Sequence, residues 1–138
     1  MKRNQCVRFA IVKIRYLAKP DNLAQECHLT EGRIYPVLAL WIDLSSKVST
    51  AVVLPDNARS PIQISSPEFE VVEHSIPQMW RIEIDLALVL MAPNEWKSQQ
   101  FWRDLFNRVP EAICTFERVL PELYQELTGE LLPHSRLN

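Results

Sequence analysis

Apolar and polar residues alternate along most of the first two thirds of the chain, the period of two that is typical of β-strands. The alternation begins in Val7–Ile11 and continues in Val12–Tyr16, but the phase shifts by one residue between these two segments. A shift of one residue moves the apolar side chains to the other face of a strand unless a β-bulge absorbs it. The pattern therefore predicts a first strand over Val7–Tyr16 that is strongly bent at Ile11-Val12.

Further short strands follow, separated by segments with turn-forming residues. Pro36 marks an edge strand or an unpaired position, since proline donates no ladder hydrogen bond. Pro67–Phe69 is expected to form a single helical turn. The expected strands are Arg33–Asp43, Val48–Leu54, Ile62–Ser65, Glu70–Glu73, Ile82–Ile84 and Leu88–Met91, the last two as a hairpin around Asp85-Leu86.

From Pro93 onward the apolar residues change to a helical period. Pro93–Trp96 predicts a short helix, and a second follows around Phe101–Phe106. A last helix is expected to begin at Pro110, because the first helical position needs no N–H donor, and to end at Gly129 as its C-cap. Pro121 interrupts this helix and predicts a kink, although the apolar stripe continues in phase across it.

Short strands followed by helices predict an α+β fold, here a small SH3-like antiparallel β-barrel with two or three C-terminal helices packed on it. The length of 138 residues fits a single domain, 1–138, with a β-rich part at about 7–91 and a helical extension at about 93–128. We expect the helices to bury Trp96, Trp102 and Phe106, and about three of the four tryptophans to be buried overall.

Composition excludes several classes of protein. Apolar residues at 47% and charged residues at 23% are typical of a globular chain and argue against disorder. Gly32 and Gly129 are the only glycines, so glycine-rich phosphate loops and dinucleotide fingerprints are excluded. Three cysteines without a CxxC pair, and no signal peptide or membrane span, predict reduced thiols in a bacterial-type cytoplasm.

The candidates for catalysis are weak. Cys27-His28 joins a thiol to an imidazole, but neighbours in sequence rarely point at one another, and no further ligand lies at metal spacing. His74 and His134 are isolated. The group Glu68, Glu70 and Glu73 can supply paired carboxylates, although the polar face of a half-buried strand explains them as well. We predict no catalytic residue, no metal and no cofactor.

Charge is segregated along the chain. Six basic residues and no acid precede Pro20, whereas the last helix is acidic, and the formal net charge is −2. Three of its acids, at i, i+4 and i+8, stack like charges along one helix face, which suggests either a basic partner or a solubilising outer face. The predicted partner-binding residues are Glu111, Glu117, Glu122, Glu126, Glu130 and Trp41.

Two segments carry a resemblance. Leu29–Val37 contains Leu-Thr-x-Gly-x-x-Tyr, and Ser66–Val72 contains a proline-initiated turn with Glu-Phe-Glu. Together they resemble the beginning and the end of small bacterial SH3-like barrels, among them immunity proteins that protect bacteria from contact-delivered, polymorphic toxins. The segments Ile76–Trp80, Ala92–Trp96, Phe101-Trp102 and Pro110–Ala112 resemble a recurrent extension of such barrels.

The resemblance implies a non-enzymatic immunity protein that binds one cognate toxin domain in the cytoplasm and neutralises it. Two alternatives remain open from the residues. One is a nucleic-acid-binding module that uses the basic first strand with Trp41 and Tyr35, and the other is a small hydrolase that uses Glu70 or His74.

Overall fold

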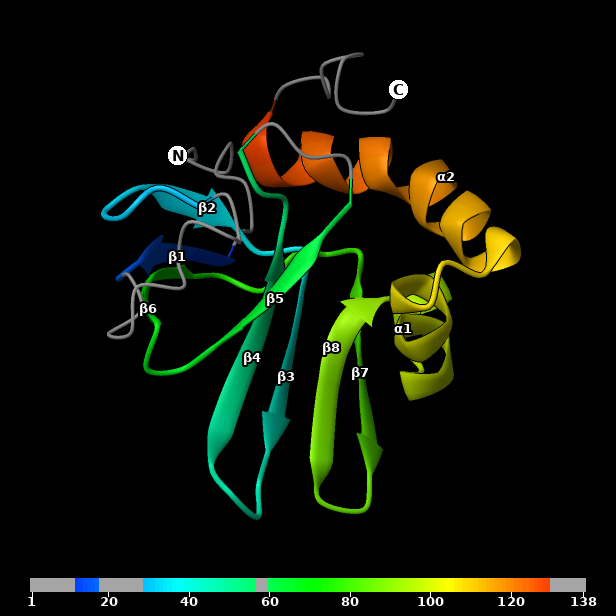
Figure 1. The fold of residues 1–138 in the computed structure, drawn as a ribbon, viewed down its shortest axis with the longest axis horizontal. Helices are drawn as coiled ribbons and strands as arrows, with labels where there is room; N and C mark the ends of the chain where they lie inside the picture. The colour runs from blue at the N-terminus through cyan, green and yellow to red at the C-terminus, as the bar shows by residue number, and fades with distance from the viewer. Residues whose placement is uncertain (1–11, 18–28, 57–59, 130–138) are drawn as a thin grey trace, which may run out of the picture.

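The computed structural model describes residues 12–17, 29–56 and 60–129 (Figure 1). This part of the chain contains eight strands, one 3₁₀-helix and two α-helices. In chain order they are β1 (Val12–Tyr16), β2 (Ile34–Pro36), β3 (Ala39–Asp43), β4 (Val48–Val53), β5 (Ile62–Ser65), β6 (Phe69–His74), β7 (Trp80–Asp85), β8 (Leu88–Pro93), η3 (Asn94–Trp96), α1 (Gln99–Phe106) and α2 (Pro110–Thr128).

The strands form two antiparallel sheets, which confirms the α+β class. The smaller sheet has the order β2-β1-β6, and the larger has the order β5-β4-β3-β8-β7. The two sheets are not closed into a barrel, so the SH3-like barrel predicted from the sequence is not confirmed. Figure 1 shows α2 running across the end of the molecule where the two sheets meet, while the β3–β4 and β7–β8 hairpins extend away from it.

The single strand expected over Arg33–Asp43 is in fact two strands in different sheets, β2 and β3. The chain changes sheet at Val37 and Leu38, whose consecutive amides point in opposite directions. The Val37 N–H donates to the Val12 carbonyl of β1, and the Leu38 N–H donates to the Val52 carbonyl of β4, both at 2.8 Å. Both side chains are buried, so the crossing lies inside the core.

A second crossing joins β5 of the larger sheet to β6 of the smaller one. The expected helical turn at Pro67–Phe69 is instead a simple turn, in which the Glu68 N–H donates to the Ser65 carbonyl at 2.8 Å. Phe69 is already the first residue of β6. Strands that pass between sheets at corners of this kind are typical of orthogonally packed β-structure.

The irregularity expected in the first strand is present, but at a later position. In the pairing of β1 with β6 the register shifts between Lys13 and Ile14. The predicted site, Ile11-Val12, lies at the limit of the described residues, and Val7–Ile11 lies outside them. Pro36 ends β2, which is an edge strand, as expected for a residue without an N–H.

The three predicted helices are present, and the last of them begins and ends where the sequence predicts, whereas α1 begins at Gln99, two residues before the predicted segment. Ser98 caps α1 by accepting the Phe101 N–H at 3.1 Å, Pro110 is the first residue of α2, and Gly129 ends α2 with a φ of 76°. A left-handed residue at this position favours glycine because no Cβ is present to clash. The helix continues through Pro121.

An aromatic cluster joins the helices to the sheet. Trp96 and Trp102 are 0% and 4% exposed, and the Trp102 indole N–H donates to the Trp96 carbonyl at 2.6 Å. The Trp96 ring stacks on Phe116 of α2 with centroids 4.7 Å apart. Trp80 is also buried, so the expectation of three buried tryptophans is confirmed.

Phe106 is not buried as predicted, because it is 37% exposed. It is the last residue of α1, and its ring lies against Trp102 with centroids 5.9 Å apart. At a helix end nothing covers the outer face of this ring among the described residues.

We expect Trp102→Ala to lower the free energy of unfolding by about 3–5 kcal/mol, because it removes a large buried aromatic side chain and leaves a cavity. Urea unfolding followed by circular dichroism measures this loss. Phe106→Ala, at the half-exposed neighbour, is the matched control and should cost about 1 kcal/mol. A loss below about 1 kcal/mol for Trp102→Ala would mean that the helices are only loosely attached to the sheet.

Candidate functional site

A groove of about 650 Å³ lies between one face of the larger sheet and α1. Its sheet side is built by cross-strand pairs: Trp41 of β3 lies opposite Leu90 of β8, and Asp43 lies opposite Leu88. Residues two apart on a strand face the same side, so Trp41 and Asp43 both line the groove. The helix side is lined by Trp102, Arg103 and Phe106, which lie on one side of α1.

The groove has an aromatic floor and a polar rim. The rings of Trp41 and Trp102 lie 5.6 Å apart, and Trp41 is only half-buried. Arg103 is exposed at the rim, where its guanidinium donates to the Gln100 side-chain oxygen at 2.8 Å. Asp43 is held by the β3–β4 turn, since its carboxylate accepts the Ser45 N–H at 2.9 Å. This arrangement suits binding of an aromatic or apolar side chain rather than proton transfer.

The sequence predicted only one residue of this groove, Trp41. Trp102 and Phe106 were predicted to be buried, because helical spacing of aromatic residues usually indicates burial, and no role was predicted for Arg103. The exposed arginine within that aromatic run, Phe101–Phe106, was the available sign of a surface site.

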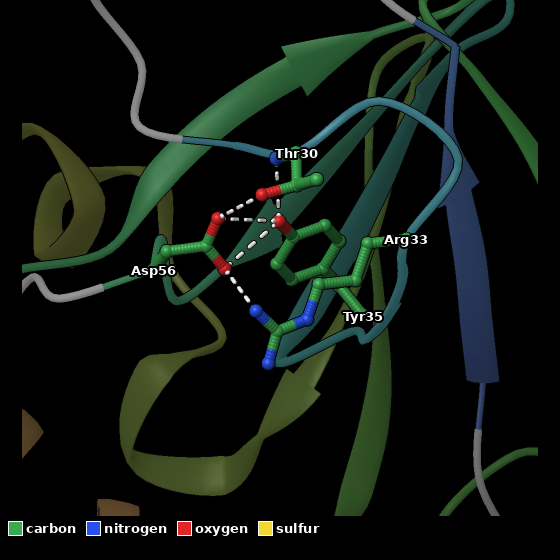
Figure 2. A network of polar contacts seen from close by, with 4 residues as sticks. All are labelled: Thr30, Arg33, Tyr35 and Asp56. Atoms are coloured by element: carbon green, nitrogen blue, oxygen red, sulfur yellow. Dashed lines mark hydrogen bonds and ion pairs between the residues drawn. The ribbon is translucent and has the colours of Figure 1, made fainter.

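A second cluster joins the segment before β2 to the segment after β4 (Figure 2). The buried Tyr35 hydroxyl donates to the Asp56 carboxylate at 3.0 Å and accepts the Thr30 N–H at 2.8 Å. The Thr30 hydroxyl donates to Asp56 at 2.6 Å, and the Arg33 guanidinium pairs with it at 2.9 Å. Burial, together with the neighbouring Asp56 carboxylate, raises the pKa of Tyr35 above its ordinary value of 10.0.

This cluster acts as a structural clasp. The Tyr35 hydroxyl, the Thr30 hydroxyl and the Asp56 carboxylate all have partners inside the cluster, and the raised pKa of Tyr35 extends the pH range over which its hydroxyl is a donor. The sequence did not predict it, because no spacing rule relates Tyr35 to a loop aspartate such as Asp56. The resemblance had singled out Thr30 and Tyr35 only as a structural motif.

The acidic residues of α2 do not form one surface. Glu111, Glu117 and Glu122 are exposed, but at 100° per residue Glu117 and Glu122 lie about 140° apart around the helix. Glu126 is engaged within the fold: its carboxylate accepts the backbone N–H of Gln78 and, at 3.1 Å, that of Met79. Glu130 lies outside the described residues. The row expected from Glu122, Glu126 and Glu130 is therefore interrupted at Glu126, and Glu117 lies on another side of α2.

The other candidates stay apart from the groove. Glu70 pairs with Arg15 at 2.7 Å, and Glu73 lies opposite Lys13 in the β1–β6 register. His74 is exposed at the end of β6, while Cys27-His28 and His134 lie outside the described residues. Within residues 12–17, 29–56 and 60–129, His, Cys, Asp and Glu form no group of three or more placed to hold a metal ion.

In the described part of the chain, no helix combines the length and the apolar character needed to cross a membrane. The structure thus defines an α+β domain with two antiparallel sheets and an aromatic groove beside α1. Comparisons with protein-family models, curated proteins and solved structures found no match for this chain.

The clasp gives a pH-dependent prediction. Tyr35→Phe should lower the free energy of unfolding by about 1 kcal/mol at neutral pH, because it removes the hydroxyl shared by Thr30 and Asp56. Since the folded-state pKa is raised, the contribution of the hydroxyl is complete below the unfolded pKa and is lost as the pH rises through the folded value.

Urea unfolding of the wild type and Tyr35→Phe from pH 7 to 11 measures this difference, which should shrink above about pH 10. Tyr124→Phe, at a half-exposed tyrosine of α2, serves as the control. A difference that grows with pH would contradict the account of the clasp.

The carboxylate of Glu126 should matter for stability, unlike that of Glu122. Glu126→Ala leaves the amides of Gln78 and Met79 without their acceptor and should cost about 1–2 kcal/mol, the range for a hydrogen bond to a charged group with partial exposure. Glu122→Ala, one turn earlier and exposed, should change stability by less than about 0.5 kcal/mol. Thermal melts of both variants compare them, and equal effects would contradict the structural role of Glu126.

Proposed function

We propose that this chain is an immunity protein that binds a cognate bacterial toxin domain in the cytoplasm and neutralises it without catalysing a reaction. The observation that carries the proposal is the groove with Trp41 and Trp102 on its floor and the exposed Arg103 and Phe106 at its rim. Tryptophan and arginine dominate the binding energy of protein–protein interfaces, and they act from pockets that exclude water.

Acidic side chains close to the groove support a cationic partner. Asp43 lines it, and Asp85 at the end of β7 accepts a hydrogen bond at 3.4 Å from Gln99, which also lines it. Complementary charge speeds the encounter of two proteins and suppresses wrong partners. The exposed Glu111 and Glu122 of α2 extend the acidic surface on another side of the molecule.

The SH3-like relationship belongs to the same proposal. It is supported by the two crossings, at Val37-Leu38 and at Ser66–Glu68, through which β2 runs on into β3 and β5 runs on into β6. The return of β6 to pair with β1 brings the ends of the six-strand segment together. An SH3-like barrel that is open on one side has this connectivity, with β7 and β8 added to its larger sheet.

The contacts of β1 favour protein binding over the nucleic-acid alternative. Arg15 is paired with Glu70, and Lys13 lies opposite Glu73, so each of these basic residues has an acidic residue of β6 beside it. Tyr35 is buried in the clasp, so its ring is not exposed to stack on a nucleic-acid base. The same ion pair occupies Glu70, the carboxylate considered for a hydrolase.

A protection assay tests the proposal. The proposal expects a toxic domain to be encoded beside the gene for this chain; that domain is expressed in a bacterial host with and without the chain, and growth is recorded. The wild type should protect, and the purified pair should form a complex by calorimetry. Arg103→Glu should weaken binding at least about tenfold, because it removes an arginine that the proposal places among the residues that dominate the binding energy.

Arg118→Glu makes the same charge reversal on the exposed face of α2 and is the matched control, with binding expected within about twofold of the wild type. Absence of protection would contradict the proposed function. If the wild type protects but Arg118→Glu binds poorly while Arg103→Glu binds normally, the interface lies on α2 and not in the groove.

A further inference from the structure

Strand β7 is the last strand of the larger sheet among the described strands, and it carries exposed isoleucines between its charged residues. Ile82 and Ile84 are 56% and 66% exposed, and Leu86 at the tip of the β7–β8 hairpin is 95% exposed. Edge strands usually carry lysine, proline or a bulge that prevents pairing with another chain. β7 contains none of these, and its register with β8 is regular over all six residues.

The backbone groups that β7 presents outward can be assigned from one hydrogen bond. The Ala87 carbonyl accepts the Leu44 N–H at 2.7 Å, so Ala87 points toward the β3 side of β8. Backbone groups of consecutive residues alternate sides, so Leu88 and Leu90 point toward β7 and bond to Asp85 and Glu83, which lie opposite them. The N–H and C=O groups of Ile82 and Ile84 therefore point outward from the sheet.

The sequence of β7 is self-complementary in an antiparallel pair. With a two-fold axis at Glu83, Ile82 lies opposite Ile84 of the second copy, and the two form a hydrogen-bonded pair through their outward groups. Arg81 of each copy then lies opposite Asp85 of the other copy. Opposite charges directly across a pair of strands stabilise it.

Neighbouring registers fit less well. An axis at Ile84 places Glu83 opposite Asp85 of the second copy, and like charges in this position repel. An axis at Ile82 needs the outward N–H of Trp80, which already donates to the Pro77 carbonyl at 3.2 Å.

We propose that two copies of this chain associate through β7, antiparallel and centred on Glu83, so that their larger sheets join into one. The pair buries the exposed Ile82 and Ile84 of both copies and satisfies their outward backbone groups. The two Glu83 side chains face each other at the axis, which opposes association, and Lys97 at 3.7 Å from each carboxylate reduces that repulsion. The proposal does not rest on the proposed function: Trp41, Trp102 and Arg103 are not in this interface, and Asp85 is the one residue that both arguments use.

Sedimentation equilibrium of the full chain over a range of concentrations tests the dimer. The wild type should shift from the 16.1 kDa monomer to twice that mass as its concentration rises. Asp85→Arg should raise the dimer Kd at least about tenfold, because it places arginine opposite Arg81 at two symmetric positions. Arg81→Asp should do the same by opposing two acids.

The double variant Arg81→Asp/Asp85→Arg exchanges the charges and should restore the wild-type Kd. Glu83→Gln should lower the Kd, because it removes the repulsion at the axis. Circular dichroism verifies that each variant is folded, and Arg118→Glu is the control for a change of net charge. The proposal is overturned if the chain is monomeric at all concentrations, which is the result expected if another segment of the same chain covers the edge. Failure of the double variant to restore association would also overturn it.

Discussion

At Val37 and Leu38 the main chain passes from one sheet to the other, and two hydrogen bonds fix its path there. One amide bonds to β1 and the next bonds to β4, so two adjacent residues join two sheets that pair with each other nowhere else in their described ladders. Because both side chains are buried, water cannot replace these bonds without opening the core. The direction in which β3 leaves this point sets the position of the larger sheet, and with it the face on which Trp41 lies.

The aromatic cluster completes the site from the other side. Trp96 is held between Trp102 and Phe116, so η3, α1 and α2 meet at one buried ring. Trp102 belongs both to this cluster and to the floor of the groove, where it lies against Trp41. A groove supported from beneath by a packed core is preorganised, which lowers the entropy cost of binding in the proposed role.

Local features were predictable from the sequence, and long-range ones were not. The Pro110 start and the Gly129 end of α2 follow from the stereochemistry of single residues, and they were predicted correctly. The division of the segment Arg33–Asp43 was missed, because a continuous apolar run has the same pattern whether it stays in one sheet or crosses to another. The acidic row on α2 failed because the engagement of Glu126 depends on a loop 47 residues away in sequence, at Met79. The groove was predicted only at Trp41, since its second wall comes from a helix whose orientation the sequence does not determine.

Hydrogen exchange of the chain, measured by mass spectrometry with and without the toxin domain that the proposed function requires, tests the central claim most directly. Binding in the groove predicts slower exchange in the segments that line it, the end of β3 with its turn to β4 and the last turn of α1 through Asn107. Exchange in the outer turns of α2 should stay unchanged. Protection confined to α2, with the groove segments exchanging as in the free protein, would contradict the account.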